Sequence, residues 1–157
     1  MTRRVQAVAA LGLAVTLLVT GCGATQLPTY EQVTDETTTA MQAIADQMPP
    51  GSEIEDVTVP TPYTCGPSSD GVFFTGHWFV HATDGFDTRA FIESLPENLG
   101  DGFTVLPPGV EISYPGVLLR AQNDNVRIDV SNPNEDEYPG IDILAMSRCA
   151  QEPPAAE

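Results

Sequence analysis

The stretch "VFFTGHWFVHA", residues 72–82, is the clearest strand in the chain and decides what fold we expect. Aromatic and β-branched residues dominate it, which is typical of β-strands. Successive side chains of a strand point to opposite faces, so its residues divide into two sets. The set that we expect to meet helices consists of Val72, Phe74, Gly76, Trp78 and Val80. The set on the other face consists of Phe73, Thr75, His77, Phe79 and His81.

Two amphipathic segments on either side of this strand predict helices. In the first, residues 29–48, Thr29 is suited to the N-cap, and Gln32 three residues later completes a capping box. Its apolar stripe consists of Tyr30, Val33, Thr37, Met41, Ile44 and Met48, and the sequence "PPG" ends it. In the second segment, which follows the strand, Asp87 is the expected N-cap, and Pro96 is expected to end the helix.

Further strands predict the layer that these helices cover. Strand character is found at residues 53–59, 102–106, 116–122, 125–131 and 140–149, and Asn123–Asp124 favours a tight hairpin turn. Two helices cannot cover both faces of such a sheet. We therefore expect an α+β fold, a two-layer sandwich in which an antiparallel meander carries both helices on one face.

The N-terminus has the layout of an export signal. Arg3 and Arg4 precede an apolar run, residues 5–19, that is too short for a comfortable permanent membrane span. The run leads into "VTGC", residues 19–22, which has the residue order of a bacterial lipobox. We predict lipidation of Cys22, which would hold the protein at the extracytoplasmic face of the cell membrane. An ordinary signal peptide with a chance cysteine, or export by the twin-arginine route, are the alternatives.

The other two cysteines predict a disulfide. With Cys22 lipidated, Cys65 and Cys149 remain, and an even number leaves no thiol over. Thiols of exported domains tend to be oxidised. We therefore expect a Cys65–Cys149 bond.

The charge excludes one class of partner. The whole chain has a formal charge of −16, and every basic residue is an arginine. After residue 21, four arginines face 22 acidic residues, which gives −18. Phosphate groups repel such a body, so we expect no nucleic-acid binding.

The two histidines of the chain do not form a zinc motif. His77 and His81 have the H-x-x-x-H spacing that places two ligands on one helical face, but Trp78 stands where zinc proteases have glutamate. In a strand this spacing spans about 13 Å, too far for one tetrahedral zinc ion.

A partial calcium-loop pattern lies in the densest acidic run. Asn132, Asn134 and Asp136 have the spacing of the first three ligand positions. Glu137 replaces the required glycine, and Ile143 replaces the final glutamate. We expect a solvated loop, and neither a metal nor a cofactor.

No familiar catalytic motif is present. The chain has no G-x-S-x-G elbow, P-loop or G-x-G-x-x-G fingerprint. Its 22 acidic residues offer many carboxylate pairs of the kind that glycosidases use, but their spacing selects none. We expect a protein that is not an enzyme, with a carboxylate-based cell-wall hydrolase as the least favoured alternative.

The order of these features resembles that of the LppA-type envelope lipoproteins of mycobacteria and their relatives. The features are the lipobox, a first helix ending in "IAD…MPPG", a loop that carries Cys65, a strand, a short helix, and strands with Cys149 near their end. The resemblance implies a lipid anchor at Cys22, an α+β domain and a disulfide. It implies no catalytic residues.

These predictions divide the chain into four parts. Residues 1–21 would be a lipoprotein signal peptide, and residues 22–28 a lipid-anchored tether of at most about 20 Å. Residues 29–149 would form a single α+β domain, and residues 150–157 a disordered tail.

The function we expect is that of a binding module of the cell envelope. Exposed apolar patches often mark such sites, and the candidate contact surface is formed by Phe73, His77, Phe79 and His81. The alternative is that residues 60–71 or 107–116 cover these side chains. The expected partners are the membrane, through the lipid anchor, and an envelope protein or small ligand. The alternative function is a carrier that holds a lipid or another apolar ligand between sheet and helices.

Overall fold

The computed structural model describes residues 26–67, 71–121, 125–134 and 137–154. The predicted signal peptide, Cys22 and the predicted turn at Asn123–Asp124 lie outside the described residues. None of the helices within the described residues combines the length and the apolar character needed to cross a membrane.

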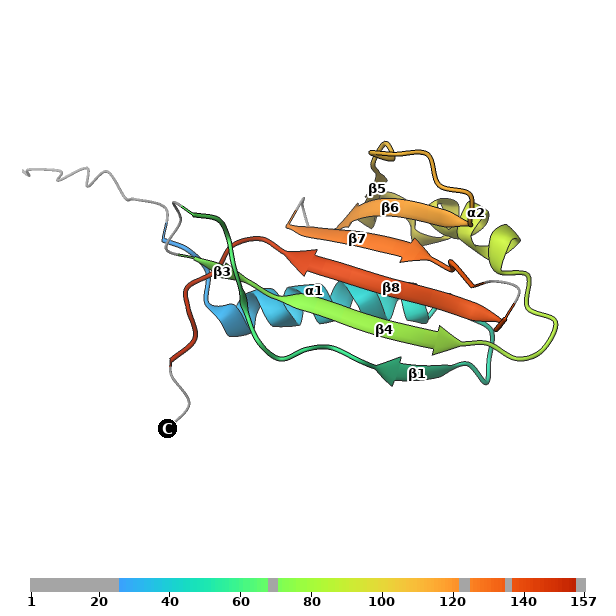
Figure 1. Cartoon of the computed structure of the whole chain (residues 1–157), viewed down its shortest axis with the longest axis horizontal. Coiled ribbons are helices and arrows are strands. Elements are labelled where there is room, and N and C mark those ends of the chain that lie inside the picture. The colour runs from blue at the N-terminus through green and yellow to red at the C-terminus, as the bar shows by residue number, and fades with distance from the viewer. Residues whose placement is uncertain (1–25, 68–70, 122–124, 135–136, 155–157) are drawn as a thin grey trace, which may run out of the picture.

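Six antiparallel strands form the main sheet (Figure 1). They are β1 (Glu53–Asp56), β4 (Thr75–His81), β5 (Phe103–Val105), β6 (Gly116–Ala121), β7 (Val126–Ser131) and β8 (Gly140–Ser147). Their order in the sheet is β1-β4-β8-β7-β6-β5. The expected simple meander is therefore wrong, because β8 returns to the middle of the sheet and separates β4 from the β5–β7 strands. This position buries Ile141, Ile143 and Ala145 completely.

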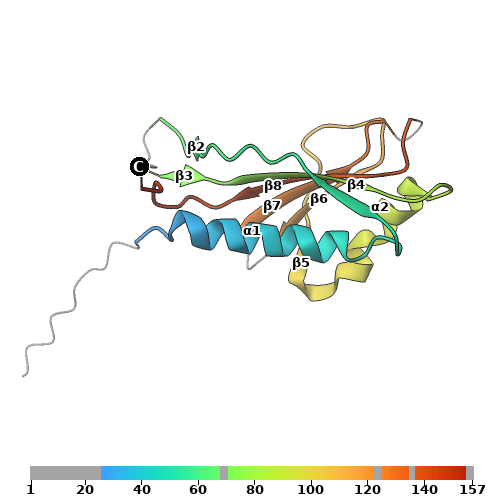
Figure 2. The same cartoon turned by 90° about the horizontal axis from the view of Figure 1, so that it is seen from below.

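Both helices pack on one face of the sheet (Figure 2). The first, α1 (Tyr30–Ala45), lies against β8, β4 and β7, and the second, α2 (Thr88–Leu99), lies against β5 and β6. One core joins the two layers; its largest fully buried side chains include Met41, Ile44, Leu95, Leu119, Ile128, Ile141 and Ile143. The predicted two-layer α+β sandwich with both helices on one face is confirmed.

The two faces of residues 72–82 are as predicted. The side chains of Phe74, Trp78 and Val80 are buried toward the helices, whereas His77 and Phe79 are half-buried and point away from them. The strand is interrupted, however, because the Phe74 backbone N–H donates to Ser147 Oγ at 2.9 Å instead of to a carbonyl of the neighbouring strand. The preceding residues form β3 (Val72–Phe73), which pairs with β2 (Tyr63–Thr64) in a small separate sheet.

The start of α1 forms half of the predicted capping box. Thr29 Oγ1 accepts a hydrogen bond from the Gln32 backbone N–H at 3.2 Å. The Gln32 side chain donates to Glu36 Oε1 instead of returning to Thr29. The predicted stripe is buried at Val33, Thr37, Met41, Ile44 and Met48 and half-buried at Tyr30.

The second helix does not end at Pro96 as predicted but continues to Leu99. A proline in a helix removes one hydrogen bond and crowds the preceding turn. Leu95 is fully buried, and Leu99 packs against the same core. This packing holds the last turn in place despite the missing hydrogen bond.

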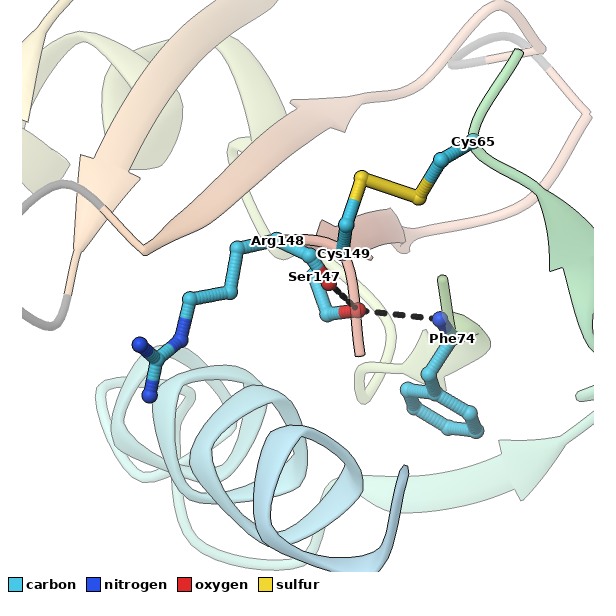
Figure 3. The surroundings of a disulfide bond; sticks show 5 residues. All are labelled: Cys65, Phe74, Ser147, Arg148 and Cys149. Atoms are coloured by element: carbon cyan, nitrogen blue, oxygen red, sulfur yellow. Dashed lines mark hydrogen bonds between the residues drawn. A yellow bond between two sulfur atoms is a disulfide. The ribbon is translucent and has the colours of Figure 1, made fainter. Parts of the chain in front are cut away.

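The predicted Cys65–Cys149 disulfide is present, with 6.0 Å between the two Cα atoms. It joins the loop before β3 to the end of β8 (Figure 3). Beside it, Ser147 Oγ accepts from the Phe74 backbone and donates to the Arg148 carbonyl oxygen at 2.7 Å. The bond therefore fastens a proline-rich loop, which has little other regular structure, to the main sheet.

The domain extends beyond both predicted boundaries. Ala150 is fully buried and exchanges two backbone hydrogen bonds with Val72, at 2.7 and 3.0 Å. The Gln151 backbone N–H donates to the Pro28 carbonyl oxygen at 2.8 Å. The prediction of a disordered tail from residue 150 is therefore wrong by at least two residues, and Pro28 belongs to the folded body instead of the tether.

Removal of the disulfide should destabilise the domain strongly. In the Cys65→Ala/Cys149→Ala variant we expect the free energy of unfolding to fall by up to about 4 kcal/mol, since the bond closes a long loop in the unfolded chain. The sequence separation of the two cysteines is 84 residues. Urea unfolding followed by Trp78 fluorescence measures the change. The unmodified protein in excess reductant serves as the control and should unfold like the variant; equal stability of the oxidised protein and the variant would contradict the prediction.

Candidate functional site

The face of the main sheet opposite the helices is the candidate site (Figure 2). We call the outward side chains of β1, β4, β8, β7 and β6 the open face. In the strand register, Leu144 of β8 lies between His77 of β4 and Asp129 of β7. Phe79 of β4 likewise lies between Glu55 of β1 and Asp142 of β8. Three of the four predicted contact residues, His77, Phe79 and His81, lie on this face.

Phe73, the fourth predicted residue, is separated from the other three. Its ring stacks on Tyr63, with 5.6 Å between the ring centroids and 22° between the planes. Tyr63 belongs to β2, within the loop region that was expected as a possible cover. Phe73 therefore packs within the small sheet beside the open face.

Each histidine of the open face is paired with a carboxylate from a neighbouring strand. His77 Nε2 lies 2.9 Å from Asp142 Oδ1 on β8, and His81 Nε2 lies 2.9 Å from Glu55 Oε2 on β1. Phe79 stands between the two histidines, with its ring centroid 5.0 Å from that of His77 and 6.5 Å from that of His81. Within the part of the chain that the structure describes, no three His, Cys, Asp or Glu residues gather as a metal site would require.

Asp142 is the electrostatically perturbed group of the open face. Burial raises the pKa of its carboxyl, the nearby His77 lowers it, and Asp129 raises it, with a net upward shift. Because the folded pKa lies above the ordinary value, the ionised Asp142 carries a stability cost at neutral pH. This cost is relieved as the pH falls through the raised pKa. Burial and the charge of Asp142 also raise the pKa of Tyr138.

The apolar part of the open face was not predicted from sequence. Leu144 and Met146 on β8 are 41% and 40% exposed, and they lie beside His77 and Thr75 of β4. The sequence does indicate this apolar surface, because residues 141–146 are apolar on both faces of the strand except at Asp142. An antiparallel strand with one solvated face normally alternates with polar residues.

The partial calcium-loop pattern has a structural role at its first residue. Asn132 is fully buried, and its side-chain amide donates to the carbonyl oxygens of Tyr138 and Gly140 at 3.2 and 3.1 Å. Its Oδ1 atom accepts from the Asn134 backbone N–H at 2.8 Å. Asp136 lies outside the described residues. Asn132 therefore holds the loop before β8 and does not face solvent as a ligand would.

A groove of about 350 Å³ lies on the helix side of the sheet, at its β1 edge. It opens between α1 and β4, where β1 ends at Asp56. Its apolar lining includes Tyr30, Met41, Phe74 and Trp78. A second groove, of about 510 Å³, also borders Tyr30 and Thr34 and runs along the start of α1 to Pro153 and Pro154.

Comparison of the chain with protein-family models, with curated proteins and with solved structures returns no match. The resemblance to LppA-type lipoproteins therefore stays a prediction.

The titration of Asp142 should report the contact with His77. We expect its carboxyl to titrate above the ordinary aspartate range and to shift further upward in His77→Gln, because the histidine charge lowers this pKa. Carboxyl ¹³C NMR as a function of pH measures both values. His81→Gln is the matched control and should leave Asp142 unchanged, since His81 pairs with Glu55. A downward shift in His77→Gln would refute the assignment.

Proposed function

We propose that the protein is a membrane-anchored lipoprotein of the cell envelope that acts as a non-enzymatic binding module through its open face. The observation that carries this proposal is an apolar row on the open face, formed by the half-buried Phe79 of β4 and the exposed Leu144 and Met146 of the neighbouring β8. Two histidine–carboxylate pairs border this row. Apolar groups surrounded by polar ones are the usual composition of a partner site.

The proposed anchor would hold this face near the membrane. Leu27 and Pro28 are tied to the domain, because the Gln151 side chain donates to the Leu27 carbonyl oxygen and its backbone donates to that of Pro28. Only residues 23–26 would then separate Cys22 from Leu27 of the folded body, a reach of at most about 18 Å. The lipobox and the resemblance to LppA-type lipoproteins support this anchor. An envelope protein reached at this distance is the partner that we propose.

A second candidate function, the carrier of an apolar ligand, is favoured by the groove beside α1. Its volume of about 350 Å³ is within the range of small-molecule sites. Trp78 and Phe74, each 8% exposed, line it together with Tyr30 and Met41. Asp56 at its border would disfavour an anionic ligand, so an uncharged lipid is the better fit.

Site-specific photo-crosslinking in intact cells tests the binding module. A photoreactive amino acid at position 79 should give a discrete crosslinked product in the membrane fraction, because this position lies in the apolar row of the open face. The matched control position is Glu97, which is exposed on α2, away from the open face. Cys22→Ser should move the protein to the soluble fraction and abolish the product.

Two outcomes would count against this proposal. Continued membrane attachment of Cys22→Ser would refute the lipid anchor. Crosslinks that are equally strong from positions 79 and 97, or absent from position 79, would refute the role of the open face.

Fluorescence of Trp78, the only tryptophan, tests the carrier. Titration with decanol, an uncharged apolar probe, should shift its emission in a saturable way, because the indole lines the groove. Thr34→Phe should fill the groove and abolish the shift. Thr39→Phe is the matched control on the exposed side of the same helix and should leave it unchanged. An emission that decanol does not change would refute the carrier function.

A further inference from the structure

A third groove lies on the open face itself, and its lining combines apolar side chains with two opposite charges. It has a volume of about 320 Å³ and lies between β7 and the loop that connects β5 to β6. Pro108, Val110 and Ile112 of that loop form one wall, and Leu118, Arg127 and Asp129 line the strands beneath it. The loop rises on the side of the sheet opposite the helices (Figure 2).

The apolar wall of this groove is left uncovered. Val110 is 72% exposed, and Ile112 is also exposed. Leu118 on β6 is half-buried and lies opposite Asp129 in the strand register. The groove therefore offers apolar surface on its wall and on its floor.

Two opposite charges on the floor have no hydrogen-bond or ion-pair partner among the described residues. Arg127 and Asp129 are exposed, lie two residues apart on β7, and point to the same face. Neither side chain makes a hydrogen bond or an ion pair with another described residue. Elsewhere on the same face, the charged groups Asp142 and Glu55 are paired with histidines.

Neighbouring charges add to the positive charge of Arg127 at one end of the groove and to the negative charge of Asp129 at the other. Arg127 lies directly opposite Arg120 in the register, a like-charged cross-strand pair that is unfavourable in itself. Asp129 interacts with the charge of Asp142 on β8. One end of the groove is thus positive and the other negative, although four arginines are all that residues 22–157 contain.

The spacing of Arg127 and Asp129 along β7 sets the size of ligand that could reach both residues. The Cα atoms of alternate residues of a strand are about 6.7 Å apart. The amino nitrogen and the carboxyl carbon of an extended dipeptide are separated by about 6 Å. A dipeptide with free ends matches both the charge order and this length, and an apolar side chain on it would meet Val110, Ile112 and Leu118.

We propose that this groove binds a zwitterionic dipeptide that carries an apolar side chain. Its carboxylate lies on the Arg127 guanidinium, which can form two parallel hydrogen bonds with it. Its ammonium group lies on the Asp129 carboxylate. The inference deepens the proposed binding function by naming a ligand class for the open face, and it rests on that function for its biological setting only.

Isothermal titration and backbone-amide NMR of the full chain in detergent test the site, with the dipeptide Ala-Leu as the probe. Saturable shifts should map to the amides of β7 and of residues 116–118. N-acetyl-Ala-Leu and Ala-Leu amide should each bind at least tenfold more weakly, because each lacks one of the two charges. These measurements need neither a membrane nor a protein partner, so their failure is distinguishable from failure of the crosslinking experiment.

Two variants identify the contact at each end. Arg127→Gln should remove the preference for the free carboxylate over the amide and retain the preference for the free amine. Asp129→Asn should do the reverse. Arg148→Gln is the matched control, since Arg148 pairs with Glu36 of α1 and does not line the groove, and it should change the affinity less than threefold.

Three results would overturn the proposal. They are the absence of saturable shifts at millimolar Ala-Leu, equal binding of the capped and free dipeptides, and shifts that map to the His77–Phe79 region instead of the groove. The NMR spectrum of each variant reports directly whether it is folded.

Discussion

The pairing of β8 with β4 is the constraint on which the rest of the structure depends. Seven residue pairs, from Thr75↔Met146 to His81↔Gly140, join the first half of the chain to its last strand. A side chain at position 140 would meet the Val80 carbonyl oxygen, and the backbone there has φ +148°, so glycine is required at this end of the pairing. The disulfide at the other end closes the same long loop.

This pairing also creates the open face. It places Asp142 within hydrogen-bonding distance of His77 and leaves Leu144 and Met146 exposed beside β4. A partly exposed histidine–carboxylate pair such as this one contributes little to stability, typically less than about 1 kcal/mol. Partly buried Asp142 carries a cost of its own when ionised. Such an arrangement adds little to stability, in keeping with the binding function that we propose for this face.

The two α-helices of the described residues, α1 and α2, both cover the same face of the sheet and leave the other face free of helices. They bury a continuous core under β8, β7 and β6, in which Ile128, Ile141 and Ile143 are fully inaccessible. The opposite side keeps its charges, its aromatic residues and a groove beside the loop of Val110 and Ile112. The helix-covered face of the sheet therefore carries the core, and the same strands present the other face, through which we propose that the protein binds.

The sequence by itself determined the class of fold, the alternation of residues 72–82, the disulfide and three residues of the open face. These follow from local rules, namely the period of a strand, helix capping and the parity of cysteines. Only the tertiary structure decided that β8 lies in the centre, that α2 continues past Pro96, that Tyr63 covers Phe73 and that Ala150 is buried. Each of these depends on contacts between residues far apart in the chain, whose free energy outweighs the local preference. The pairings of His77 with Asp142 and of Arg127 with Arg120 were also decided by the tertiary structure alone, because strand order and register cannot be predicted from any single segment of the sequence.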